Sequence, residues 1–135
     1  MNVVEREDVP VLYVSRRDEM PKAAREAFEE LERRVGDLRG RKFYGVFAPR
    51  EGEYRACVAA GTEGEAQTLG LTEGVIPGGR YLKETLRGEP EQIYARIPAT
   101  FDSLSTAAGA IDYSRPSIEF YRRHDEVVLL LPIEG

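Results

Sequence analysis

The spacing of apolar side chains predicts a strand, a helix and two further strands in the first half of the chain. A short run of strand-favouring residues at 11–14 precedes residues 21–35, where apolar side chains recur at three- and four-residue steps. Residues 42–47 and 53–60 then have the composition of strands. The helix's other face is dense in charge, which is typical of a solvated surface.

The second half repeats this order of elements. A long apolar run at residues 74–86 leads into a helical stretch at 90–108, and two strand-like segments follow at 117–122 and 126–133. The repeat is one of element order, because the halves share little residue identity. Two such units side by side share a seam, and seams of this kind are common places for a small-molecule cleft.

Several local signals refine this outline. Pro98 falls inside the second helical stretch, so we expect a kink there or two shorter helices. Residues 61–74 are rich in Gly, Thr and Glu and are predicted to be a loop joining the halves. The Pro-Gly-Gly at 77–79 indicates a turn or bulge. The continuous apolar run at 127–131 predicts a central strand covered on both faces.

Length and charge limit the classes of protein. With 135 residues, 41% of them hydrophobic, the chain is expected to be one domain, with halves at about 1–61 and 74–135. The net charge of −5 disfavours nucleic acid as a partner and weakly favours a cationic one. No segment resembles a signal peptide or a membrane span, so the expected location is cytoplasmic with no membrane partner.

Few residues are suited to catalysis or to binding a cofactor. His124 is expected in a solvated hairpin turn, and Cys57 in a strand as a buried structural thiol. One cysteine and one histidine cannot form a usual zinc site, so no metal is expected. The sequence has neither a P-loop nor a dinucleotide fingerprint, and we expect no cofactor.

One carboxylate stands out in the strand predicted at 117–122. Period-two alternation places Glu119 and Tyr121 on one face, and Ile118 and Phe120 on the other. If Ile118 and Phe120 face the helices, Glu119 and Tyr121 face the opposite side, toward the seam. A carboxylate there is unfavourable unless it is paired or hydrated. The alternative is an exposed glutamate on an edge strand, and spacing alone favours neither interpretation.

Tyrosines on the predicted strands sharpen the first interpretation. Five of them fall on strands: Tyr13, Tyr44, Tyr54, Tyr81 and Tyr121. Tyrosine packs as a large apolar group and keeps a polar tip. A cleft lined by tyrosines around one carboxylate suits a flat, apolar cation, held by cation–π contact and charge pairing. About half of these tyrosines are expected to be structural instead.

The order of two short motifs adds a resemblance. The segments at 75–81 (VIPGGRY) and 117–121 (SIEFY), together with the doubled element order, resemble the GyrI-like small-molecule-binding domain. That domain is also the effector-binding domain of AraC-type and MerR-type multidrug regulators of bacteria. The resemblance covers nearly the whole chain. It implies an α+β fold in which two strand-helix-strand-strand repeats are related by a pseudo-two-fold axis. The antiparallel sheet would carry the helices on one face and a central cleft.

The resemblance also implies a set of binding residues. The family's pocket glutamate maps onto Glu119 and its strand tyrosine onto Tyr121. Further aromatic positions of the cleft are assigned from strand position to Tyr44, Tyr13 and Phe47. The chain departs from the family in lacking a tryptophan near the middle of the second helix. It also has no helix-turn-helix region, so it is expected to be a stand-alone member.

Three functional classes follow from the resemblance. The first is a small-molecule-binding protein for hydrophobic, cationic compounds. The second is a hydrolase of cyclopropane-bearing electrophilic toxins, with Glu119 as the base that activates water and Tyr121 as the proton donor or oxyanion stabiliser. The third is a protein-binding inhibitor of DNA gyrase type, which leaves a protein partner open. Binding and hydrolysis would use the same residues, so the sequence does not separate them.

Overall fold

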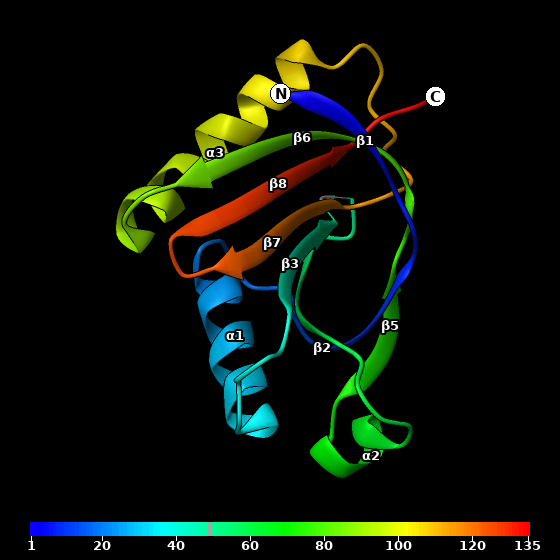
Figure 1. Cartoon of the computed structure of the whole chain (residues 1–135), viewed down its shortest axis with the longest axis vertical. Helices are drawn as coiled ribbons and strands as arrows, with labels where there is room; N and C mark the ends of the chain where they lie inside the picture. The colour runs from blue at the N-terminus through cyan, green and yellow to red at the C-terminus, as the bar shows by residue number, and fades with distance from the viewer. Residues whose placement is uncertain (49) are drawn as a thin grey trace.

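Eight strands form one antiparallel sheet that curls into a half-barrel (Figure 1). The computed structural model describes residues 1–48 and 50–135. The strands are β1 (Asn2–Arg6), β2 (Val9–Arg16), β3 (Phe43–Ala48), β4 (Glu53–Ala59), β5 (Thr72–Ile76), β6 (Gly79–Arg87), β7 (Ser117–Arg123) and β8 (Glu126–Pro132). The helices are α1 (Lys22–Val35), α2 (Glu65–Leu69) and α3 (Pro90–Ala107).

The strand order shows the two-fold relationship of the halves. Along the sheet it runs β1-β6-β8-β7-β3-β4-β2-β5, and exchanging the halves reverses it onto itself. Strands β3 and β7 form the central pair, and the flanking strands match in turn. Helix α1 packs on β2 and β4, and α3 packs on β6 and β8. The expected α+β fold, with two repeats and the helices on one face of an antiparallel sheet, is confirmed.

Two bent strand pairs close the half-barrel on the side away from the helices (Figure 1). Strand β1 leads directly into β2, and β5 leads directly into β6. Across the sheet, β1 pairs with β6 and β2 pairs with β5. The bends meet where the backbone N–H of Gly78 donates to Asp8 Oδ1 at 2.6 Å. A Cβ at Gly78 would lie 2.5 Å from the carbonyl oxygen of Arg6, so only glycine fits there. The turn expected at 77–79 is confirmed.

Three apolar clusters fill the molecule. One lies inside the half-barrel and includes Val11, Tyr44 and Leu130. The second lies beneath α1 and the third beneath α3. Every residue of β8 is buried, as expected for a central strand covered on both faces. The helix face and the interior of the half-barrel are therefore both packed surfaces.

Some local expectations are wrong. Of the two alternatives expected at Pro98, a kink or two shorter helices, the second is wrong, because α3 runs as one helix through Pro98. Pro98 is exposed, and water can satisfy the carbonyl that it leaves without a partner. Residues 61–74 are not simply a loop, because they contain α2 and the start of β5. Strand β1 was not anticipated, since its apolar content is only two adjacent valines.

Among the residues that the structure describes, no helix is long and apolar enough to span a membrane.

Candidate functional site

The central strands bring Glu119 to the seam between the halves. Glu119 on β7 lies directly opposite Gly45 on β3. Its carboxylate bonds to tyrosines that pack beneath α1 and α3, so Glu119 and Tyr121 face the helices. Ile118 and Phe120 face the interior of the half-barrel. The condition that Ile118 and Phe120 face the helices is therefore wrong. Both faces of β7 are packed, so alternation separates its faces without saying which one meets the helices.

Two tyrosine hydroxyls hold one oxygen of this carboxylate. Tyr54 Oη donates to Glu119 Oε1 at 2.9 Å, and Tyr121 Oη donates to the same oxygen at 2.5 Å. Across residues 1–48 and 50–135, no protein donor hydrogen-bonds Oε2. Glu119 is half-buried on a central strand, which rules out the exposed edge-strand interpretation. The carboxylate is thus oriented through one oxygen, and the other is available to a ligand.

Aromatic rings from both helices pack against the two tyrosines that hold the carboxylate. Phe28 of α1 packs edge-on against Tyr121, with ring centroids 5.3 Å apart, and against Tyr54 at 6.1 Å. Tyr94 of α3 also packs edge-on against Tyr121, with ring centroids 6.3 Å apart. We call Phe28, Tyr54, Tyr94, Glu119 and Tyr121 the seam cluster. Its members come from both halves of the chain.

Burial shifts the titration of the seam cluster. It raises the pKa of Glu119, and the hydrogen bonds from Tyr121 and Tyr54 offset part of that rise. Burial and the neighbouring Glu119 carboxylate raise the pKa of Tyr54 and Tyr121. Both phenols therefore stay protonated and donate at ordinary pH. The site is a carboxylate held by neutral donors, with no cation of the protein bonded to it among the described residues.

Glycine at position 45 makes room for this arrangement. The Tyr54 side chain crosses above Gly45 to reach Glu119. A Cβ at position 45 would overlap the Tyr54 hydroxyl and lie 2.5 Å from Glu119 Oε1. Beside Tyr121, the pairing of β7 with β8 shifts register between Phe120 and Arg123. Irregularities of this kind re-aim side chains near functional sites.

The predicted binding residues fall on both faces of the sheet. Phe47 lies on the helix face, partly buried beneath α1. Tyr44 and Tyr13 belong to the interior of the half-barrel instead. Tyr44 stacks on Phe120 at 4.8 Å, and Tyr13 lies under the guanidinium of Arg55 at 4.2 Å. The structure therefore brings Glu119 and Tyr121 together and places Tyr13 and Tyr44 across the sheet from them.

Sequence reasoning missed three contributors to the seam cluster. Tyr54 was recognised as a strand tyrosine but was not assigned to the site. It pairs across strands with Phe47, a register that the sequence does not reveal. Phe28 and Tyr94 lie in the two stretches predicted to be helices, and neither was assigned to the site. The site places a tyrosine of β4 and a glycine of β3 next to the carboxylate on β7. This arrangement can be recognised only once the pairing of these strands is known.

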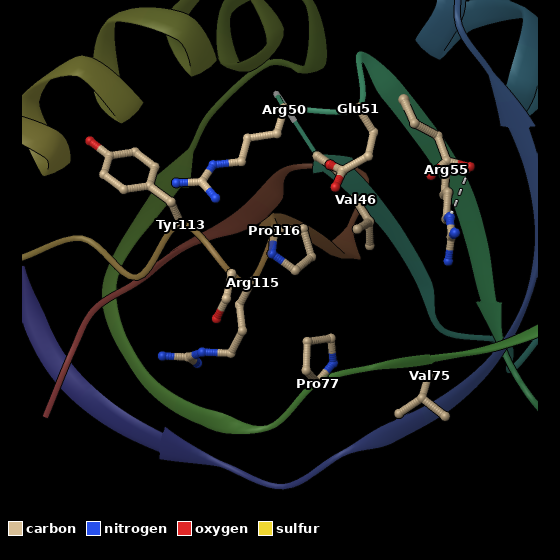
Figure 2. Close-up of a pocket in the computed structure, with 12 residues that line it drawn as sticks. Val46, Arg50, Glu51, Arg55, Val75, Pro77, Tyr113, Arg115 and Pro116 are labelled. Atoms are coloured by element: carbon tan, nitrogen blue, oxygen red, sulfur yellow. Dashed lines mark ion pairs between the residues drawn. The ribbon is translucent and has the colours of Figure 1, made fainter.

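A cavity lies on the other face of the sheet, at the open mouth of the half-barrel (Figure 2). Its volume is about 250 Å³, and it is lined in part by Val46, Arg50, Arg55, Pro77 and Pro116. The remaining labelled residues come from the β3–β4 turn, from β5 and from the segment before β7. We call this cavity the mouth basin. It is separate from the seam cluster, although strand β7 begins at the basin and carries Glu119.

The fold is shared with solved structures, whereas sequence comparison finds no match. No protein-family model matches the chain, and no curated protein matches it in sequence. An integron cassette protein from the mobile metagenome of Vibrio cholerae superposes with a TM-score of 0.80 at 15% identity, over 98% of this chain and 95% of that one. SAV2435, solved with bound tetraphenylphosphonium, superposes with a TM-score of 0.67 at 12% identity, over 99% of this chain and 93% of that chain.

A third similar structure is a hydrolase from Listeria innocua. It superposes with a TM-score of 0.55 at 12% identity, over 98% of this chain and 90% of that chain. At such identities the likeness concerns the fold.

Proposed function

We propose that this chain is a small-molecule-binding protein of the GyrI-like type, and that the seam cluster binds hydrophobic cations. The observation that carries the proposal is the Glu119 carboxylate. It is half-buried and held at Oε1 by two tyrosine hydroxyls. Its Oε2 has no protein donor among the described residues. The tetraphenylphosphonium bound to SAV2435 gives the proposal further support.

The physical argument rests on a carboxylate without a cationic partner. Removing a carboxylate from water is unfavourable unless a counter-charge is supplied, and the raised pKa of Glu119 reflects this. A bound cation would supply that charge, while the rings of Phe28, Tyr94 and Tyr121 offer faces and edges for its apolar surface. Phe47 lies on the same face of the sheet and can extend that surface.

Each residue of the seam cluster has a distinct task in this proposal. Glu119 provides the charge, while Tyr54 and Tyr121 orient it and keep Oε2 directed to the ligand. The exposed Tyr94, with 52% of its surface accessible, can change rotamer to admit a ligand. Tyr13 and Tyr44 face the interior of the half-barrel, so they are not part of the proposed site. The aromatic positions of that site are instead Tyr54, Phe28 and Tyr94.

The direct test is calorimetric titration with tetraphenylphosphonium and with neutral triphenylphosphine oxide, which has a similar shape. We expect Glu119→Gln to weaken the cation by about 1–3 kcal/mol, the range of a charge-assisted hydrogen bond. The neutral compound should change much less. The exposed Glu63, in the segment before α2, provides the matched control Glu63→Gln, which should bind both compounds like the wild type. Equal losses for both compounds in Glu119→Gln would contradict the proposal.

Hydrolysis is the second candidate, and one observation favours it. The raised pKa of Glu119 makes this carboxylate a stronger base than an ordinary glutamate, and its Oε2 is available to a water. Glu119 would remove a proton from that water as its oxygen attacks the strained cyclopropane carbon. The ring carbon–carbon bond would break, its electron pair would pass to the oxygen of a carbonyl conjugated with the ring, and Tyr121 would donate to that oxyanion. It ranks second because the Tyr121 hydroxyl donates to Glu119 itself in this structure.

A further inference from the structure

The mouth basin has a composition unlike that of the seam cluster. Its floor is apolar, formed by Val46, Val75, Pro77 and Pro116, while arginines and glutamates stand around it (Figure 2). Three arginines and two glutamates line it, in a protein of net charge −5. A concave apolar floor with a few charged groups at its rim is the usual form of a small-ligand site.

Arg115 is a structural member of this wall. Its Nε donates to Asp112 Oδ2 at 2.8 Å, and its terminal nitrogens donate to the carbonyls of Gly78, Arg80 and Ile133 at 3.3, 3.0 and 2.8 Å. The guanidinium also stacks over Tyr81 at 4.7 Å. These bonds tie the segment before β7 to β6 and the end of β8. Arg115 therefore fixes the shape of the basin and has little capacity left for a ligand.

Arg50 and Arg55 retain donors for a ligand. Arg55 pairs through Nε with Glu53 at 3.1 Å, and its terminal nitrogens make no hydrogen bond within residues 1–48 and 50–135. Arg50 has no ion-pair partner in that same part of the chain, and its guanidinium lies 5.6 Å from the centre of the exposed Tyr113 ring. Figure 2 shows the Arg50 side chain reaching across the basin toward Tyr113.

We propose that the mouth basin is a second binding site, for a small planar organic anion of the aromatic monocarboxylate class. The carboxylate pairs with the planar fork of Arg50, which reaches across the basin toward Tyr113, and Arg55 adds positive charge on the opposite side (Figure 2). The ring lies on Pro77 and Pro116 and against Tyr113. The cavity of about 250 Å³ has room for a one- or two-ring acid. This site selects the charge opposite to the one that the seam cluster is proposed to select.

A naphthalene acid makes a direct probe. The protein has no tryptophan, so the fluorescence of 2-naphthoate can be followed against a weak tyrosine background. Because the site is small, we expect a dissociation constant on the order of a millimolar or below. Removing one charge-assisted contact in Arg50→Gln should weaken 2-naphthoate by about tenfold. The neutral amide, 2-naphthamide, should bind the wild type about as weakly as 2-naphthoate binds the variant.

Matched variants separate this site from the seam cluster. Glu51→Gln removes a negative charge from the rim, so it should keep or strengthen 2-naphthoate binding, whereas Glu119→Gln should not affect it. Circular dichroism of Arg50→Gln should match the wild type, since Arg50 is exposed. Equal binding of acid and amide by the wild type, or unchanged binding in Arg50→Gln, would overturn the proposal. Loss of binding in Glu119→Gln would place the anion elsewhere and also overturn it.

Discussion

Gly45 and Glu119 lie opposite each other on the two central strands, and the Glu119 carboxylate occupies space that a side chain at position 45 would need. A Cβ on Gly45 would lie 2.5 Å from Glu119 Oε1. It would also overlap the Tyr54 hydroxyl, which crosses above Gly45 to bond that oxygen. The pseudo-symmetric central pair is thus asymmetric in its side chains. One strand supplies the carboxylate, and the other supplies the room around it.

The first prediction concerns this pair. Gly45→Ala should lower the free energy of unfolding by about 1–3 kcal/mol, because the added methyl group overpacks a buried position. The variant should also bind tetraphenylphosphonium less tightly, because Tyr54 can no longer hold Glu119 Oε1. Urea unfolding and calorimetry measure the two effects. Gly109→Ala is the control, because nothing lies within 4 Å of its added Cβ, and its stability should stay within about 0.5 kcal/mol of the wild type.

The second prediction concerns stability and pH at Glu119. Its folded pKa is raised above the ordinary 4.5 by burial, so the folded state holds the proton more tightly than the unfolded state. The contribution of Glu119 to stability is therefore present below the ordinary pKa, and it is lost as the pH rises through the raised pKa of the folded state. Glu119→Gln should be more stable than the wild type at neutral pH, by about 0.5–2 kcal/mol. The gain should shrink in acid, as urea unfolding at several pH values will show.

Glu65 provides the control of opposite sign. Hydrogen bonds from Arg41 hold the pKa of Glu65 below its usual value. Its contribution is present above the ordinary carboxyl pKa and is lost as pH falls through the lowered one. Glu65→Gln should therefore reduce stability at neutral pH and have little effect in acid. If Glu119→Gln and Glu65→Gln show the same pH trend, the raised pKa of Glu119 is wrong.

Much of the fold followed from periodicity. Helix α1, the buried strand β8 and the turn at 77–79 were predicted because each depends on local spacing or on a glycine that the backbone requires. The turn at His124 between β7 and β8 was also predicted. Strand β1 and helix α2 were missed. Both are short, and they form because the half-barrel gives them partners rather than through their own apolar pattern.

The site was harder to predict than the fold. Glu119 and Tyr121 share a face by simple alternation, and the structure brings them into contact. Tyr13 and Tyr44 were assigned to the cleft because they lie on strands, but strand membership does not say which face a side chain takes. Both faces of this sheet are packed, so each strand offers apolar residues to either side. Only the register of β3, β4 and β7 shows that Tyr54 lies on the face with Glu119 and Tyr44 on the opposite face.

The third prediction concerns the hydroxyl of Tyr121. Its hydrogen bond, like that of Tyr54, favours the charged form of Glu119. Tyr121→Phe should therefore raise the pKa of Glu119 further, and cation binding should be lost at a higher pH than in the wild type as pH falls. Titrations of tetraphenylphosphonium across the acidic range give the midpoint for each protein. Tyr44→Phe, on the other face of the sheet, should leave the midpoint unchanged.

The fourth prediction concerns Cys57, which is buried in the interior of the half-barrel. Burial raises the pKa of its thiol to about 12. The folded protein should therefore react with a thiol reagent such as dithionitrobenzoate far more slowly than the urea-unfolded chain, because only the thiolate attacks. Fast labelling of the native protein would mean that the interior opens readily.

The fifth prediction separates binding from hydrolysis at the seam cluster. A binding site needs a surface complementary to its ligand, whereas a hydrolase must also place a water between Glu119 and the electrophilic carbon, with a donor at the oxyanion. In this structure the Tyr121 hydroxyl donates to Glu119 at 2.5 Å and Tyr54 donates to the same oxygen, so both donors are committed to the carboxylate. We therefore expect binding without turnover.

The measurement is incubation with a cyclopropane-bearing alkylator, with ring-opened product followed by chromatography. Product should not exceed the background rate seen with Glu119→Gln, while the intact compound should still raise the melting temperature of the wild type. Multiple turnovers that disappear in both Glu119→Gln and Tyr121→Phe, but persist in Tyr44→Phe, would show instead that the tyrosine leaves the carboxylate to stabilise the oxyanion and that the chain is a hydrolase.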